Sequence, residues 1–163
     1  MQPGATPLLK AEGLILRPLS QRDAGALGLE PAVAESLLAE AQRGSALLWL
    51  LAPNPRQPGF GWIGLRGLDG LHRRASLGGL VRPEQRRQGH MLAAARRVLD
   101  YGFQDLRLHR IGARLDPENA AGQALLARLG FQPEGRLRGY RSGADGGPRD
   151  VLLFSRLASD AAP

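Results

Sequence analysis

The segment Arg86-Arg87-Gln88-Gly89-His90-Met91 is basic, contains a glycine and lies between two apolar patterns. The run before it, 75–81, has the length of a buried strand, and the apolar residues after it, over 92–103, recur at helical spacing. The segment would therefore form the turn from a strand into a helix N-terminus. Unpaired backbone N–H groups and the positive end of the helix dipole make such a turn a binding site for anions. A diphosphate suits this chemistry best.

Several polar side chains in or near this pattern have a structural interpretation as well as a chemical one. Arg86 and Arg87 could hold phosphate oxygens as bidentate donors, or could be solvated turn residues in a chain rich in arginine. His90 could donate to a phosphate or face solvent. Farther along, Asn119 stands where a helix N-cap belongs, and asparagine caps helices well without any ligand. The segment alone indicates an anion site without identifying its ligand.

The apolar patterns predict one mixed α/β domain over 10–158, with flexible ends at 1–9 and 159–163. Ser20 and Asp23 have the spacing of a capping box and predict the start of a short helix. Strands are expected at 14–19, 46–52, 60–68, 74–81, 108–115, 131–137 and 150–157. Helices are expected from residue 20, and over 31–43, 90–105 and 119–129.

The composition excludes several classes of protein. Because the chain has no cysteine, it can form no disulfide, thiolate zinc site or cysteine nucleophile. No apolar run approaches the roughly 18 residues of a membrane span, and 1–6 lack a signal-peptide pattern. We therefore expect a cytoplasmic protein without membrane contact. The three histidines are too scattered for a metal cluster, so no metal is expected.

The net charge of +7 favours acidic partners, including a phosphorylated cofactor. Lys10 is the one lysine among 22 basic residues, and the arginines are spread along the chain rather than clustered. This spread argues against nucleic acid as the main partner.

Taken in order, the motifs resemble those of the GCN5-related N-acetyltransferases (the GNAT superfamily). The most similar branch is the RimJ and RimL type, which acetylates ribosomal-protein N-termini. The resemblance covers nearly the whole chain, from Leu14 to Leu157. It rests on Leu14-Ile15-Leu16-Arg17-Pro18-Leu19 with Asp23, Arg86-Arg87-Gln88-Gly89, Leu108-His109-Arg110-Ile111-Gly112-Ala113-Arg114, Asp116-Pro117-Glu118-Asn119 before Leu129-Gly130-Phe131, and more weakly Glu134-Gly135-Arg136-Leu137-Arg138 before Asp150.

The resemblance implies a seven-stranded mixed sheet flanked by about four helices and splayed between its fourth and fifth strands, 74–81 and 108–115. It also implies acetyl-CoA as co-substrate, with the pantetheine arm along the splayed strand and the diphosphate at the turn. Because dimers are common in the family, a homodimer is a further hypothesis. The residues expected to bind acetyl-CoA are Leu80, Val81, Arg86, Arg87, Gln88, Gly89, His90, Met91 and Asn119.

The sequence departs from the family at positions that touch the chemistry. Met91 replaces the small last residue of the phosphate loop. Ser76 and Ala93 stand where related chains often carry a glutamate, and Gly122 stands where the ribosomal-protein branch has a serine. Tyr140 is then the best remaining acid for protonating the departing thiolate.

The sequence therefore predicts direct transfer of acetyl from acetyl-CoA to a primary amine. The acceptor would be a protein or peptide N-terminus, or a small-molecule amine. Two alternatives stay open: a module of the same fold that binds CoA without catalysis, and a basic nucleic-acid-binding domain. A ligand that binds only the folded state raises the melting temperature. CoA should therefore stabilise the enzyme and the non-catalytic CoA-binding module, but not the nucleic-acid-binding domain.

Overall fold

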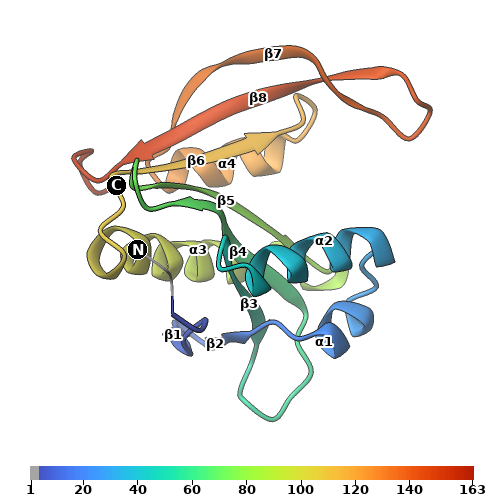
Figure 1. The fold of residues 1–163 in the computed structure, drawn as a ribbon, viewed down its shortest axis with the longest axis vertical. Helices are drawn as coiled ribbons and strands as arrows, with labels where there is room; N and C mark the ends of the chain where they lie inside the picture. The colour runs from blue at the N-terminus through green and yellow to red at the C-terminus, as the bar shows by residue number, and fades with distance from the viewer. Residues whose placement is uncertain (1–3) are drawn as a thin grey trace.

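The structure, a computed structural model, describes residues 4–163, and within this range it forms one mixed sheet of eight strands. The strand order is β1-β2-β3-β4-β5-β6-β8-β7, and β5 and β6 are the parallel pair (Figure 1). The strands are β1 (Leu9–Ala11), β2 (Leu14–Pro18), β3 (Ala46–Ala52), β4 (Gly61–Asp69), β5 (Arg74–Val81), β6 (Arg110–Leu115), β7 (Gln132–Ser142) and β8 (Pro148–Leu157). The helices are α1 (Gln21–Ala26), α2 (Pro31–Gln42), α3 (His90–Asp100) and α4 (Ala120–Arg128), with a 3-10 turn at Pro83–Gln85 and a π-helical turn at Tyr101–Asp105.

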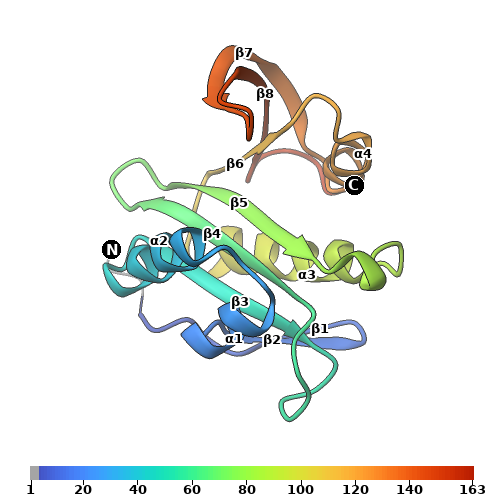
Figure 2. The same ribbon diagram turned by 90° about the vertical axis from the view of Figure 1, so that its right-hand side faces the viewer.

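Two apolar layers cover the two faces of the central strands. Figure 2 shows α1 and α2 on one face and α3 on the other. All seven residues of β3 are buried, and residues 46–51 alternate between the layers. Trp49 joins the layer that contains Val98 of α3, and Leu48 joins the layer that contains Leu37 of α2. A strand covered on both faces has no polar side, which explains why β3 reads as a continuous apolar run.

The structure has eight strands where seven were expected, and the difference lies at the N-terminus. β1 adds an eighth strand, because Leu9–Ala11 pairs antiparallel with β2. Leu9 is buried, and the backbone carbonyl of Pro7 accepts a hydrogen bond of 2.7 Å from Trp49 Nε1. The three residues of β1 are too short for an apolar period to show, so only the tertiary contacts reveal this strand.

The predicted splay between the fourth and fifth expected strands is confirmed, and it lies between β5 and β6. Within the described chain these strands pair over three positions, from Arg74 with Arg110 to Ser76 with Gly112. Beyond Ser76, β5 continues to Val81 and β6 continues to Leu115 without pairing to each other. Figure 2 shows the two strands diverging, so the backbone edges of both are open on the inner side of the split.

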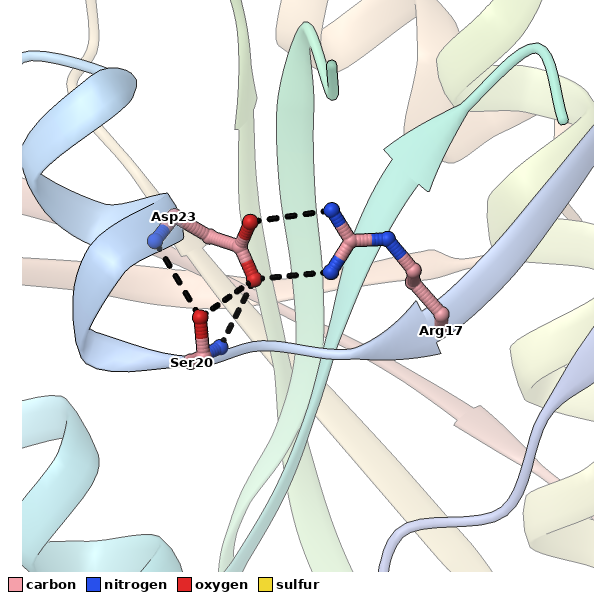
Figure 3. A network of polar contacts seen from close by, with 3 residues as sticks. All are labelled: Arg17, Ser20 and Asp23. Carbon is pink, nitrogen blue, oxygen red and sulfur yellow. Dashed lines mark hydrogen bonds and ion pairs between the residues drawn. The ribbon is translucent and has the colours of Figure 1, made fainter. Parts of the chain in front are cut away.

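A polar network holds the first helix against the sheet (Figure 3). Both terminal nitrogens of Arg17 donate to the carboxylate of Asp23 at 2.9 Å, and Ser20 and Asp23 form the predicted capping box of α1. Burial raises the pKa of Asp23, but the hydrogen bonds from Arg17 and Ser20 outweigh it and leave this pKa below its usual range. The network fixes where α1 leaves β2, and α1 leads directly into α2.

Candidate active site

A cleft of 720 Å³ opens where β5 and β6 part. Its floor comes from Ser76 and Gly78 of β5 and from Gly112 and Arg114 of β6. Glu40 of α2 lines it as well, so the cleft opens on the sheet face that α1 and α2 cover. The lining includes Arg74, Ala75 and Ser76, which pair with β6, and Leu77 and Gly78 beyond them, so the cleft lies over the sheet face where the split begins.

The turn that follows β5 has the backbone geometry expected from the sequence. Gly89 is the N-cap residue of α3 and adopts the left-handed conformation, with φ of 79°, which glycine tolerates best. Arg87 is also left-handed, with φ of 62°. Within the described residues no side chain caps α3, so the N–H groups of its first turn lie open. An uncapped start of a helix of 11 residues is suited to an anion.

Three side chains of the turn make contacts that shape it. Arg86 Nε donates to the carbonyl of Val81 at 3.1 Å and so ties the end of β5 to the turn. Gln88 Nε2 donates to the carbonyl of Glu84 at 3.3 Å. The Nε2 atom of His90 lies 3.2 Å from Gln88 Oε1, and its ring packs on Phe60 with centroids 4.6 Å apart. These contacts give Arg86 and His90 a structural role, whereas Arg87 is exposed.

Met91, at the end of the turn, directs its side chain to the core. Its side chain packs against the core, and its Cε atom would be 3.1 Å from a Cβ placed on Gly79. Gly79 of β5 therefore provides the space that Met91 fills. The departure at Met91 therefore adds a larger side chain to the core and leaves its backbone N–H in the first turn of α3. On β5, Leu80 is 45% exposed and Val81 is buried, as alternation along a strand requires.

Asn119 is a helix cap, and its position explains the missing serine at Gly122. Asn119 Oδ1 accepts a hydrogen bond of 2.8 Å from the backbone N–H of Gly122, at the start of α4. A Cβ on Gly122 would lie 2.8 Å from Asn119 Nδ2. Any side chain at Gly122 would therefore displace the asparagine that caps the helix. The exposed Asn119 side chain keeps an amide donor for other partners.

Tyr140 lies beside the cleft and does not line it. It is on β7, is 51% exposed, and its ring centroid is 5.4 Å from the guanidinium carbon of Arg114, which does line the cleft. Asp150 on β8 accepts from the backbone N–H of Gly139 at 2.8 Å and from Arg136 at 2.7 Å. Asp150 therefore shapes the bulge of β7 next to Tyr140.

The two carboxylates that line the cleft are both held as anions. Glu40 forms a bidentate ion pair with Arg66 of β4, and the hydrogen bonds of Arg66 lower the pKa of Glu40 despite partial burial. The backbone N–H of His72 and the side chain of Arg74 lower the pKa of Asp69. A base works best when its pKa is near the operating pH, so neither carboxylate is well suited to take a proton from an amine. Sequence reasoning missed the Glu40–Arg66 pair, for which the only signal was a charged residue in an apolar strand.

Two properties of the described residues bear on cofactors and membranes. Over 4–163, no group of three or more histidine, cysteine, aspartate or glutamate residues is arranged to hold a metal ion. In the same range, no helix has the length and apolar character needed to cross a membrane.

Comparison with known proteins places this geometry in a family. A family model described as an acetyltransferase (GNAT) domain matches residues 13–132. The chain belongs to the GNAT acetyltransferases. An uncharacterized N-acetyltransferase of Bacillus subtilis, YoaA, is 31% identical over 170 aligned positions, which cover 91% of this chain and 96% of that protein. The structure of Mycobacterium smegmatis RimJ in complex with CoA-disulfide is 28% identical, with a TM-score of 0.76, and the match covers 93% of this chain and 86% of that one.

A third relative has an acceptor in its name. The spermidine N(1)-acetyltransferase of Escherichia coli is 34% identical over 77 residues, which are 47% of this chain and 41% of that protein. The GNAT resemblance predicted from the motifs is confirmed, and the chain is an N-acetyltransferase of a family that uses acetyl-CoA. The relatives include this spermidine acetyltransferase and a protein described as a putative ribosomal N-acetyltransferase, so family membership leaves the acceptor of this chain open.

Proposed function

We propose that this N-acetyltransferase binds acetyl-CoA where β5 and β6 part and receives its acceptor amine from the face covered by α1 and α2. The observation that carries the proposal is a juxtaposition. The unpaired end of β5 runs directly into a turn that ends at the uncapped start of α3. An open strand edge suits the amide groups of the pantetheine arm, and an uncapped helix start suits the diphosphate.

In this proposal the cofactor-binding residues divide into two groups. The backbone groups of Leu80, Val81, Gly89, His90 and Met91 bind the arm and the diphosphate, with Arg87, Gln88 and Asn119 adding side-chain donors. Arg86 is a positioning residue, because its Nε atom is bonded to the Val81 carbonyl and holds β5 on the turn. The surroundings of Gly89 also suit a bulky anion, since a Cβ placed on this residue would have no other atom within 4 Å.

The proposed transfer step needs no charged side chain at the reacting atoms. Acetyl-CoA, when bound, supplies an activated acetyl carbon. The amine nitrogen bonds to this carbon as the carbon–sulfur bond breaks, the amine loses a proton, and the thiolate gains one. An N–H of the open β5 edge can polarise the acetyl carbonyl as an oxyanion hole does. Tyr140 is the proposed acid for the thiolate, reached along the side of the cleft that Arg114 forms.

Proton removal from the amine is the step without a dedicated base in this proposal. Glu40 and Asp69 are engaged by arginines and have lowered pKa values. The acceptor would therefore react as the neutral amine, with water taking the proton. We expect kcat/KM to rise with pH up to the acceptor amine's own pKa. If kcat/KM instead reached a plateau at a pH well below that pKa, a base on the enzyme would be indicated.

Thermal unfolding with and without acetyl-CoA, at low and moderate salt, tests the binding part of the proposal. A shift of several degrees that survives the added salt supports it, because acetyl-CoA would then stabilise the folded state through a specific site. No shift would contradict it. Steady release of CoA with a panel of amines then separates an enzyme from a non-catalytic CoA-binding module. The homodimer stays a prediction, which sedimentation can test.

A further inference from the structure

The charges that line the cleft are unequal. Four arginines line it, and two carboxylates do, Glu40 and Asp69. Three of the arginines have carboxylate partners: Arg66 with Glu40, Arg74 with Asp69, and Arg110 with Glu134 of β7. Among the described residues, the fourth arginine, at position 114, forms no ion pair with a carboxylate. The cleft therefore has one guanidinium whose charge no acidic group of the described chain balances.

The strand geometry places this guanidinium next to the point where the strands part. Arg114 lies two residues beyond Gly112, the last residue of β6 that pairs with β5, which is about 7 Å along the strand. The side chains of Ile111 and Ala113 enter the core on the α3 side. Arg114 alternates with them, and it lines the same cleft as Glu40 of α2. Its charge thus faces the side from which the acceptor is proposed to enter.

The contact with Tyr140 leaves the binding capacity of Arg114 intact. The guanidinium lies over the tyrosine ring, with 5.4 Å from its Cζ atom to the ring centroid. A cation–π contact of this kind is electrostatic and does not use up the hydrogen-bond donors of the guanidinium. Its N–H donors lie in the plane of the group and can still hold a carboxylate with two parallel hydrogen bonds. The aromatic ring restrains the arginine, so less conformational freedom is lost when a ligand binds.

We propose that the acceptor of this enzyme is a primary amine that carries a carboxylate within about two residues of the amine, and that Arg114 binds this carboxylate. The inference rests on the proposed location of the acceptor. A free amino acid and a peptide N-terminus with an early acidic residue share the required chemistry. A polyamine would instead bring several positive charges beside an unbalanced arginine, which costs binding energy. The cleft thus selects against acceptors of the spermidine type.

Matched acceptors that differ in one charge test the proposal. The peptide pair is Ala-Asp-Ala-Ala amide with Ala-Asn-Ala-Ala amide, the small-molecule pair is alanine with alaninamide, and spermidine completes the panel. We expect kcat/KM to be about tenfold higher for the acidic member of at least one pair, with the effect in KM. Which pair shows it distinguishes a peptide from a free amino acid. Equal values within both pairs, or the highest value for spermidine, would overturn the proposal.

Arg114→Gln removes the guanidinium charge and should bring the acid-to-amide ratio close to one while leaving the KM for acetyl-CoA unchanged. Arg128→Gln is the control, because it removes the same charge from an exposed position at the end of α4. An acid preference that survives Arg114→Gln would also refute the inference.

A separate measurement keeps this inference distinct from the proposed function. If none of these amines released CoA, the proposed transfer would be contradicted for this class of acceptor. Calorimetric binding of the peptide pair to the CoA-saturated protein would then decide the acidic preference without turnover. Tighter binding of the aspartate peptide, lost in Arg114→Gln, supports the inference, and equal binding of the two peptides contradicts it.

Discussion

The turn at 86–91 and the cleft between β5 and β6 are neighbours, but they are built from different parts of the chain. The turn is largely local: a left-handed Gly89, an open helix start and side-chain hydrogen bonds between residues at most five positions apart. The cleft brings together side chains from α2, β4, β5 and β6, such as Glu40 and Arg66, which are 26 positions apart. In the proposed complex the turn binds acetyl-CoA mainly through backbone groups. The cleft is lined by side chains, and in our proposal these side chains determine which acceptor is bound.

The largest expected effect would show whether Tyr140, beside the cleft, takes part in the chemistry. Tyr140→Phe removes the proposed acid, so kcat should fall by about 100-fold, while the thermal shift caused by acetyl-CoA stays the same. Steady-state kinetics with any accepted amine measures this. Since the phenyl ring still lies beside Arg114, the variant keeps the cation–π contact. An unchanged kcat would mean that the thiolate takes its proton from water.

The next largest effect would test whether the turn at 86–91 binds acetyl-CoA. Gly89→Leu puts a side chain on a left-handed residue, which costs about 1–2 kcal/mol or forces the turn to move. Gly146→Leu is the matched control, because Gly146 has φ of 78° against 79° at Gly89 and similar open space, but lies at the tip of the β7–β8 hairpin. Both variants should lose similar stability. Only Gly89→Leu should weaken acetyl-CoA binding, by about tenfold or more in Kd, as measured by calorimetry.

The same contrast explains what could be predicted from the sequence. Gly89, the helix after it and the capping box at Ser20 leave signals within a few residues, so the turn and most elements were predicted correctly. β1 has three residues, and its pairing with β2 shows only in three dimensions. The Glu40–Arg66 pair and the cation–π contact of Arg114 with Tyr140 each join residues 26 positions apart, and no local pattern encodes such contacts.

A smaller effect would separate the two roles of Asn119. Aspartate caps a helix as well as asparagine does, but it has no amide donor to offer acetyl-CoA. Asn119→Asp should therefore keep the melting temperature and weaken acetyl-CoA binding. Asn119→Ala should lose both, with a stability cost of about 1 kcal/mol. Thermal unfolding with and without acetyl-CoA gives both quantities. If Asn119→Asp binds acetyl-CoA as the natural chain does, Asn119 is a cap alone.

The smallest effect concerns the ion pair between Arg110 and Glu134, which links β6 to β7. Glu134 of β7 accepts hydrogen bonds from Arg110 of β6 and from Ser155 of β8. These bonds, with Arg110 contributing most, lower the pKa of Glu134 from 4.5 to about 2. A carboxyl group whose pKa is lower in the folded chain contributes its full stabilisation above its unfolded pKa and loses it as the pH falls through the folded value.

Glu134→Gln should therefore be less stable than the natural chain at neutral pH, by about 0.5 kcal/mol because the pair is partly exposed to solvent. The difference should shrink as the pH falls from 4.5 towards 2, where the natural chain loses the same charge. Denaturant unfolding at a series of pH values measures it. A difference that does not change over this range would mean that the hydrogen bonds of Glu134, rather than its charge, join β6, β7 and β8. In that case hydrogen-bond geometry would hold β6, β7 and β8 together beside the cleft. The charges of the side chains would then matter only for those that line the cleft.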